Sequence, residues 1–162
     1  MRSLAAVLLA LAVVPAAYGA SFSFTVNTAS PVTAPGVTLN GDDQTKSFTM
    51  QYTVAYTGGQ NNAGWNVSAS ATTPTSGLNT LPALAVTGVT NASCTGGGCV
   101  NPTNSITWPI TLSASAQKIF NAAATTGQGT VVLTATFQMT YPANAMPGTY
   151  ASVVTVNGTT GP

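Results

Sequence analysis

The sequence predicts an all-β protein, an antiparallel β-sandwich of the immunoglobulin-like type with about seven to nine strands and little helix. Apolar and polar residues alternate with a period of two over most of the chain, as they do in half-buried strands. Clusters rich in Gly, Pro, Asn and Thr separate the alternating runs, which is typical of turns. Only 3% of the residues are charged, but hydrophobic residues make up 44% of the chain, which is enough to fill a core.

Five runs alternate clearly, and each is expected to form one strand with a buried face and a threonine-rich face in water. The first is the short run 22–26, in which Phe22, Phe24 and Val26 alternate with Ser and Thr. The others are residues 48–56, 65–71, 106–112 and 131–141. With turns at short intervals between them, these strands favour a sandwich.

The remaining elements are less regular. Residues 84–90 and 149–158 are interpreted as two further strands. Residues 115–127 contain several alanines and Lys118, and are the one candidate for a short helical turn. Pro109 lies in the run 106–112 and faces away from its apolar side, which predicts a strand at a sheet edge or a bulge.

The first 19 residues have the pattern of a secretory signal peptide. Arg2 precedes an apolar run over residues 4–14, and the small-residue pattern Ala17-Tyr18-Gly19 follows. The run is shorter than the roughly 20 residues that a membrane-spanning helix needs. We therefore expect cleavage after Gly19, a mature single domain of residues 20–162 without a transmembrane segment, and a secreted or extracellular cell-surface location.

Two cysteines, Cys94 and Cys99, lie in the glycine-rich segment 91–102. In an exported protein such a pair is more often bridged than free. A zinc site usually needs four ligands and the chain has no histidine, while thioredoxin-like pairs are separated by two residues rather than four. The pattern favours a Cys94–Cys99 disulfide that closes a loop tip, and no metal site.

Composition argues against several classes of function. Without Arg2, the two lysines balance Asp42 and Asp43, so the mature chain has a formal charge of zero and nothing to attract nucleic acid or an anionic membrane. General acid–base catalysis has few candidates, because histidine and glutamate are missing and the two aspartates lie in the turn-like segment NGDDQT. We expect a protein that is not an enzyme and takes no cofactor.

Several segments of the mature chain match a family pattern: NNAGWNVSASAT, LPALAVTGVT, the cysteine loop, KIFNAAATTGQGTVVLTATFQMTYPANAMPGTY and the final Pro162. Together they resemble the WxL domain of Gram-positive surface proteins. The resemblance implies a β-rich domain that associates non-covalently with peptidoglycan or another cell-surface polymer.

The resemblance also implies candidate ligand-binding residues. Trp65-Asn66-Val67 corresponds to the first W-x-L motif, with valine where leucine is usual, and Tyr150 is the tyrosine that precedes the second motif. Val156 and Gly158 stand where the second motif has tryptophan and leucine. The candidates are therefore Trp65, Val67 and Tyr150.

Two interpretations stay open at this point. The Trp65 and Trp108 indoles lie on alternating runs, so each is either a core side chain or, if exposed, a platform for a sugar ring. The N-terminal strand, residues 20–27, either completes its own sheet or adds to the sheet of a neighbouring copy. The second case is the alternative function, a structural subunit of an extracellular fibre or pilus whose partners are other copies of itself.

Overall fold

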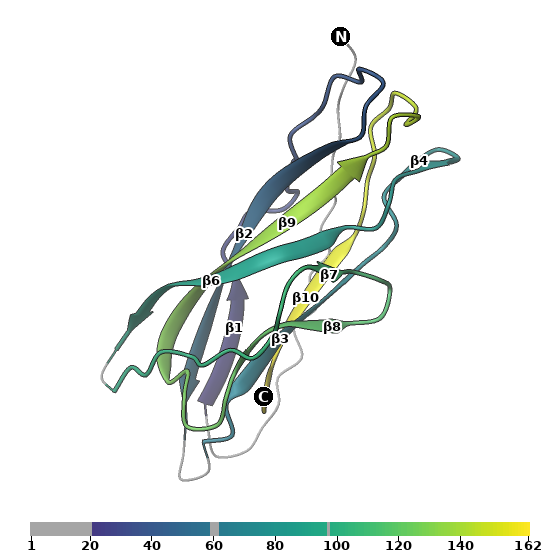
Figure 1. Cartoon of the computed structure of the whole chain (residues 1–162). Coiled ribbons are helices and arrows are strands. Elements are labelled where there is room, and N and C mark those ends of the chain that lie inside the picture. Colours follow the sequence, from purple (N-terminus) through teal and green to yellow (C-terminus); the bar gives the residue numbers. More distant parts are fainter. Residues whose placement is uncertain (1–20, 59–61, 97) are drawn as a thin grey trace.

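The computed structural model describes residues 21–58, 62–96 and 98–162, and within these ranges the chain forms ten strands and no helix (Figure 1). The predicted signal peptide lies outside them. Two antiparallel sheets curl around a common core, which confirms the all-β, sandwich-like class. The strands are β1 (Ser21–Val26), β2 (Gln44–Thr57), β3 (Trp65–Ala71), β4 (Thr75–Ser76), β5 (Asn79–Thr80), β6 (Ala85–Thr95), β7 (Ile110–Thr111), β8 (Gln117–Ala122), β9 (Gly129–Tyr141) and β10 (Val154–Thr160).

The larger sheet has the strand order β1-β2-β9-β6-β7, and the smaller one has the order β10-β3-β8. The two longest strands, β2 and β9, pair along their whole length, from Gln44 opposite Tyr141 to Tyr56 opposite Gly129. A small hairpin, β4–β5, stands apart from both sheets. The long alternating runs of the sequence thus form the middle of the larger sheet, where both neighbours are strands.

The core lies between the two sheets and consists of the apolar members of the alternating runs. From Phe48 on β2 and from Val131 on β9, every second residue is buried, as the period of two predicts. Aromatic rings meet across the strands: Phe48 stacks on Phe137 with 5.4 Å between ring centroids, and Trp65 stacks on Phe120 at 5.8 Å. The pattern that predicted the strands is therefore also the pattern that fills the interior.

The helical turn expected within residues 115–127 is wrong, because this segment contains strand β8. A β-bulge explains the error: Phe120 pairs with Val67 and Lys118 pairs with Ser68, so Ile119 is an extra residue on β8. Ile119 and Phe120 are consequently both buried, and the period of two is interrupted. Two adjacent apolar residues interrupt the alternation that would otherwise indicate a strand in the sequence.

Only part of the expected strand 106–112 pairs as a strand. Its end forms β7, two residues long, at the edge of the larger sheet. This edge position agrees with the expectation from Pro109.

The preceding segment, residues 103–108, lies along the free edge of β8 instead. The backbone N–H of Ala123 donates to the Thr103 carbonyl (2.9 Å), and that of Asn121 donates to the Asn104 side-chain oxygen (3.0 Å). The indole Nε1 of Trp108 donates to the carbonyl of Ile119 (3.0 Å). One backbone bond and two side-chain bonds thus take the place of a regular ladder along this edge.

Strand β1 is the other edge of the larger sheet and pairs with β2 from Ser21 opposite Thr57 to Val26 opposite Tyr52. Its Phe24 ring stacks on Tyr52, with 5.7 Å between centroids. The rings of Phe22 and Phe24 also cover Gly158 of β10, where an added Cβ would lie 2.8 Å from Phe24 and 3.0 Å from Phe22. In this chain the N-terminal strand completes its own sheet and links it to the smaller one.

Candidate functional surface

Trp65, the first candidate ligand-binding residue, is a core side chain with 0% of its surface exposed. Its Nε1 donates to the Gly127 carbonyl at 2.8 Å, which satisfies the polar atom of the indole. A Cβ at position 127 would lie 2.5 Å from that nitrogen, so the glycine permits the close approach. In this structure the indole has no exposed face on which a sugar ring can stack.

Val67 and Tyr150, the other two candidates, are buried as well. Val67 lies two residues after Trp65 on β3, and hence on the same inner face of the smaller sheet. Tyr150 is 3% exposed and its hydroxyl donates to the Met146 carbonyl at 2.8 Å. The structure brings none of the three to the surface, and of the two open interpretations for Trp65 it shows the core.

The two residues that the resemblance aligns with the second W-x-L motif lie in the interior too. Val156 is buried, and Gly158 lies beneath the rings of Phe22 and Phe24. The space that a larger residue at position 158 would fill is therefore taken by aromatic side chains of β1.

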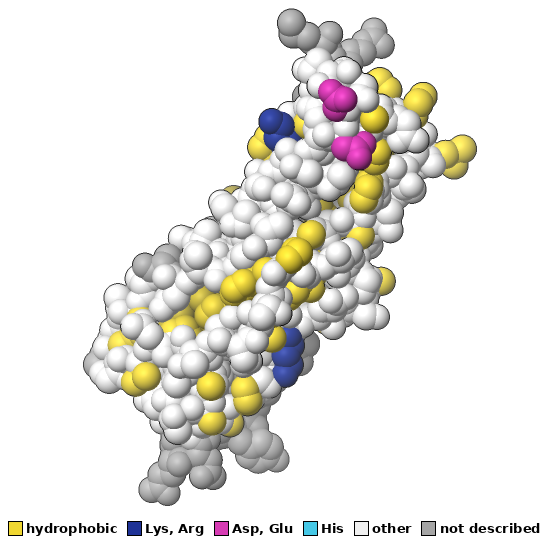
Figure 2. Space-filling view, in the orientation of Figure 1, with side chains coloured by type: hydrophobic (Ala, Val, Ile, Leu, Met, Phe, Trp, Pro, Cys, Tyr) yellow, Lys and Arg dark blue, Asp and Glu magenta, His cyan; other side chains and the backbone are white. Residues whose placement is uncertain are grey.

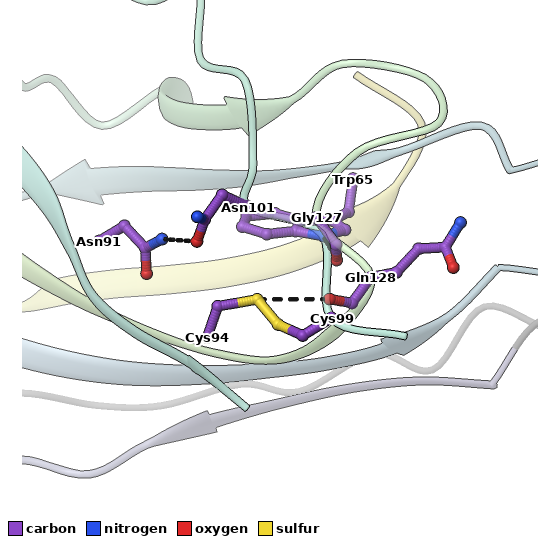
Figure 3. The surroundings of a disulfide bond; sticks show 7 residues. All are labelled: Trp65, Asn91, Cys94, Cys99, Asn101, Gly127 and Gln128. Atoms are coloured by element: carbon purple, nitrogen blue, oxygen red, sulfur yellow. Dashed lines mark hydrogen bonds between the residues drawn. A yellow bond between two sulfur atoms is a disulfide. The ribbon is translucent and has the colours of Figure 1, made fainter. Parts of the chain in front are cut away.

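The predicted disulfide is present and joins Cys94, near the end of β6, to Cys99, with 6.1 Å between the Cα atoms (Figure 3). Gly96 and Gly98 have positive φ angles of 104° and 77°, which suits glycine in so tight a ring. We call the described residues between the two cysteines, 94–96 and 98–99, the disulfide ring.

The segment 127–128 connects the disulfide ring to Trp65. The Gln128 carbonyl accepts a hydrogen bond from the N–H of Val100 at 3.1 Å, and the neighbouring Gly127 carbonyl holds the indole of Trp65. Figure 3 shows the ring and the indole on either side of this segment. The ring is therefore packed against the end of the sandwich at a fixed place.

The two aspartates are structural, as their turn-like sequence predicted. The Asp42 N–H donates to the side-chain oxygen of Asn40 at 3.1 Å, and Asp43 Oδ1 accepts the N–H of Ala143 at 2.7 Å. Asp43 thereby ties the turn before β2 to the loop after β9. The acidic side chains lie together at one end of the molecule (Figure 2).

The outer face of the larger sheet is covered with hydroxyl groups. Because Phe24, Val54 and Val131 point into the core, their strand neighbours point outward. We call the outward side chains of β1, β2 and β9 the threonine face; none of them is charged or aromatic. They are Ser21, Ser23, Thr25, Thr45, Ser47, Thr49, Gln51, Thr53, Ala55, Thr57, Thr130, Val132, Thr134, Thr136, Gln138 and Thr140.

Strand register arranges this face in rows that run across the sheet. Thr25 lies beside Thr53 and Thr53 beside Val132, while Thr49 lies beside Thr136. Neighbouring strands are about 4.8 Å apart, so the hydroxyls form a closely spaced array. Such an array can donate and accept hydrogen bonds, but offers no charge to an ion.

A groove with a volume of about 320 Å³ lies at the end of the threonine face next to the disulfide ring. No acidic or basic side chain lines it. Its lining residues are Ser21, Phe22, Ser23, Ala55, Tyr56, Thr57, Thr95, Gly96, Gly129 and Thr130. The chemistry of this lining suits an uncharged ligand with hydrogen-bonding groups.

The hydroxyl-rich strand faces are predictable from the sequence, but the groove is not. Ser23, Ala55, Thr130 and Thr95 come from four strands and form one row only through the pairing of β1 with β2, β2 with β9 and β9 with β6. Each of these residues is unremarkable in its own segment. Only the strand register would have pointed to the site.

Comparison of the chain with protein-family models, with curated proteins and with solved structures finds no match in any of the three. Within the described residues, no helix has both the length and the apolar character to cross a membrane.

Proposed function

We propose that the mature protein is a non-catalytic protein of the extracellular cell surface that associates non-covalently with an uncharged cell-surface polymer, such as the glycan strands of peptidoglycan. The threonine face is the observation that carries this proposal. It extends over three strands and offers hydroxyl groups without a single charged side chain.

In this proposal the threonine face holds the polymer through many weak contacts. One hydrogen bond to a neutral hydroxyl contributes about 0.5–1.5 kcal/mol net, too little to hold a ligand alone. A polymer with repeating hydroxyl and amide groups meets several rows of the face at once, and linked contacts strengthen one another. A small mobile ligand gains no such advantage from an extended face.

The resemblance to the WxL domain supports the same class of partner. The contacts differ from those that the resemblance implies, because Trp65, Val67 and Tyr150 are buried. In this proposal the W-x-V segment builds the core, and the outer face of the opposite sheet meets the polymer.

Co-sedimentation with purified peptidoglycan tests the proposal. We compare residues 20–162 with a variant that places two carboxylates on the threonine face, Thr53→Glu with Thr134→Glu. The matched control, Thr73→Glu with Ala114→Glu, adds the same charge at exposed loop positions outside this face. We expect the wild type and the control to pellet with the polymer. The face variant should stay in the supernatant while circular dichroism shows that it is folded, although it loses the hydrogen bonds between Thr53 and the Asn27 side chain.

Two results would contradict this proposal. One is a wild-type protein that stays in solution with peptidoglycan. The other is a folded face variant that pellets as well as the wild type, since the polymer would then bind elsewhere.

One observation favours the fibre subunit as a second candidate. Strand β1 lies at a sheet edge, and β2 is its only ladder neighbour among the described strands. Such an edge can pair with another copy. Deletion of residues 20–27 separates the cases: a fibre subunit would lose filaments in electron micrographs but stay soluble, whereas a monomer would lose thermal stability.

A further inference from the structure

The groove at the end of the threonine face has one wall that belongs to the disulfide ring. Thr95 and Gly96 lie inside the ring and also line the groove. Across from them, β9 contributes Thr130, which pairs with Thr95 in the sheet. The ring is therefore part of the surface that a ligand in the groove would touch.

Gly129 fixes the distance between the ring and β9. Its φ angle is 92°, and a Cβ there would lie 2.7 Å from the Thr95 carbonyl oxygen and 3.0 Å from the Cys99 sulfur. Only glycine combines this backbone angle with so close an approach. The ring consequently rests directly on the backbone at the start of β9.

The row of side chains along the groove combines polar and apolar groups. Ser23, Ala55, Thr130 and Thr95 follow one another across four strands. Ser21 and Thr57 already hydrogen-bond to each other at the edge of the groove. The hydroxyls of Ser23, Thr95 and Thr130 make no hydrogen bond within the described part of the chain.

We infer that this groove is a subsite for one uncharged sugar unit, with the disulfide ring as the wall that sets its width. A sugar ring has an apolar face and a rim of hydroxyls, which match the Ala55 methyl group and the hydroxyls on either side of it. The volume of about 320 Å³ is at the lower end of the range of roughly 300–1,000 Å³ for ligand pockets. The inference rests on the proposed function, because it names the place on the threonine face where the polymer is held most closely.

The inference gives the disulfide a role in binding as well as in stability. The ladder of β6 with β9 still holds Thr95 without the bond, but from Gly96 onward the glycine-rich segment is then free to take other conformations. The wall then no longer has a fixed position, and the ligand must order it on binding. Binding in the groove should therefore be weaker without the bond.

The test is an NMR titration of residues 20–162 with chitotetraose, a soluble and uncharged oligomer of N-acetylglucosamine. We expect amide shifts to cluster at Ser23, Ala55, Thr95 and Thr130. Ala55→Glu should abolish binding, because it places a carboxylate in the middle of the groove. The matched control, Thr49→Glu, lies on the same face of the same strand but away from the groove, and should keep the wild-type affinity.

The disulfide is tested with a double variant, Cys94→Ser with Cys99→Ser, which should bind chitotetraose at least fivefold more weakly. If this variant does not fold, the comparison of Ala55→Glu with Thr49→Glu still decides the inference. Shifts that avoid the groove, or an Ala55→Glu variant with full affinity, would overturn it.

The outcome for the subsite can be told apart from the outcome for the proposed function. If the protein pellets with peptidoglycan but chitotetraose does not shift the groove residues, only the subsite is wrong. If the shifts map to the groove but the protein does not pellet, the subsite holds and the cell-wall function is wrong.

Discussion

The inner face of the sandwich and the outer face of its larger sheet differ in exposure and in the chemistry of their side chains. The inner face holds the aromatic residues, including the motif-like Trp65, and is closed to solvent. The outer face of the larger sheet is open, neutral and rich in hydroxyls. The aromatic residues therefore maintain the fold. The serines and threonines of the outer face form the surface available to a partner.

The largest effect should follow from Trp65→Ala, which breaks the inner face. The indole is fully buried and stacked on Phe120, and its removal leaves a large cavity. We expect a loss of about 3–5 kcal/mol of unfolding free energy in a denaturant titration. Trp108→Ala is the control and should cost less, since Trp108 is half-buried. A Trp65→Ala protein of wild-type stability would show that the indole does not support the core.

Gly158→Leu, which introduces the residue usual in the second motif, should come next. The new side chain would collide with the rings of Phe24 and Phe22, and overpacking of this kind costs about 1–3 kcal/mol or more. The control is Gly88→Ala, where an added Cβ meets nothing within 4 Å. In a thermal melt, Gly88→Ala should have a melting temperature close to that of the wild type, whereas Gly158→Leu should melt at a lower temperature.

A double variant sharpens this result. Phe24→Ala combined with Gly158→Leu should be more stable than the sum of the two single changes predicts, because the leucine would occupy the space of the lost ring. Strict additivity would mean that the two residues do not share this space.

A smaller loss should follow from Tyr150→Phe. The Tyr150 hydroxyl donates to the Met146 carbonyl at 2.8 Å, and a hydrogen bond of this kind contributes about 1 kcal/mol. The midpoint of chemical unfolding should fall accordingly, without a change in the slope of the transition. An unchanged midpoint would mean that water replaces the lost bond at no cost.

Tyr52→Phe should have the smallest effect on stability at neutral pH. Unlike the substitutions above, it should not destabilise the protein. The Tyr52 hydroxyl is buried without a hydrogen-bond partner, so its removal should leave stability unchanged or raise it by up to about 1 kcal/mol.

The same substitution should matter more in alkaline solution. Burial raises the pKa of Tyr52 well above its ordinary value, so the folded protein keeps a proton that the unfolded chain releases above about pH 10. Stability is therefore fully present below that pH and falls as the pH rises, by up to about 1.4 kcal/mol per pH unit. Chemical unfolding at pH 8 and pH 11 should show a smaller difference for Tyr52→Phe than for the wild type.

The parts of the fold that the sequence predicted are those with local signals. Residues 48–56, 65–71 and 131–141 alternate without interruption and lie in β2, β3 and β9, and the disulfide follows from two cysteines in a glycine-rich loop behind a predicted signal peptide. Strand β8 was missed because the bulge at Ile119 breaks the alternation. Residues 106–112 alternate like a strand, but the first three of them belong to a segment, 103–108, that bonds to the edge of β8 partly through side chains such as Asn104.

The candidate surface was predictable only in part. The sequence predicts threonine-rich wet faces on single strands, because that pattern is contained within each run. It does not predict which faces adjoin, since Ala55 and Thr130 become neighbours only through the register of β2 with β9. The alternation of residues 65–71 predicts that Trp65 and Val67 are buried, whereas the resemblance to the W-x-L motif predicted that they bind a ligand.

The segment 103–108 also bears on whether strand edges of two copies of this protein can pair. Free strand edges are templates for aggregation, and many proteins guard them with lysines, which are scarce here. Backbone groups of Ile119 and Asn121 on β8, and of Ala123 just after it, instead bond to Trp108, Asn104 and Thr103. An incoming strand would find these groups already bonded, so this edge is protected from intermolecular β-pairing without the use of charge.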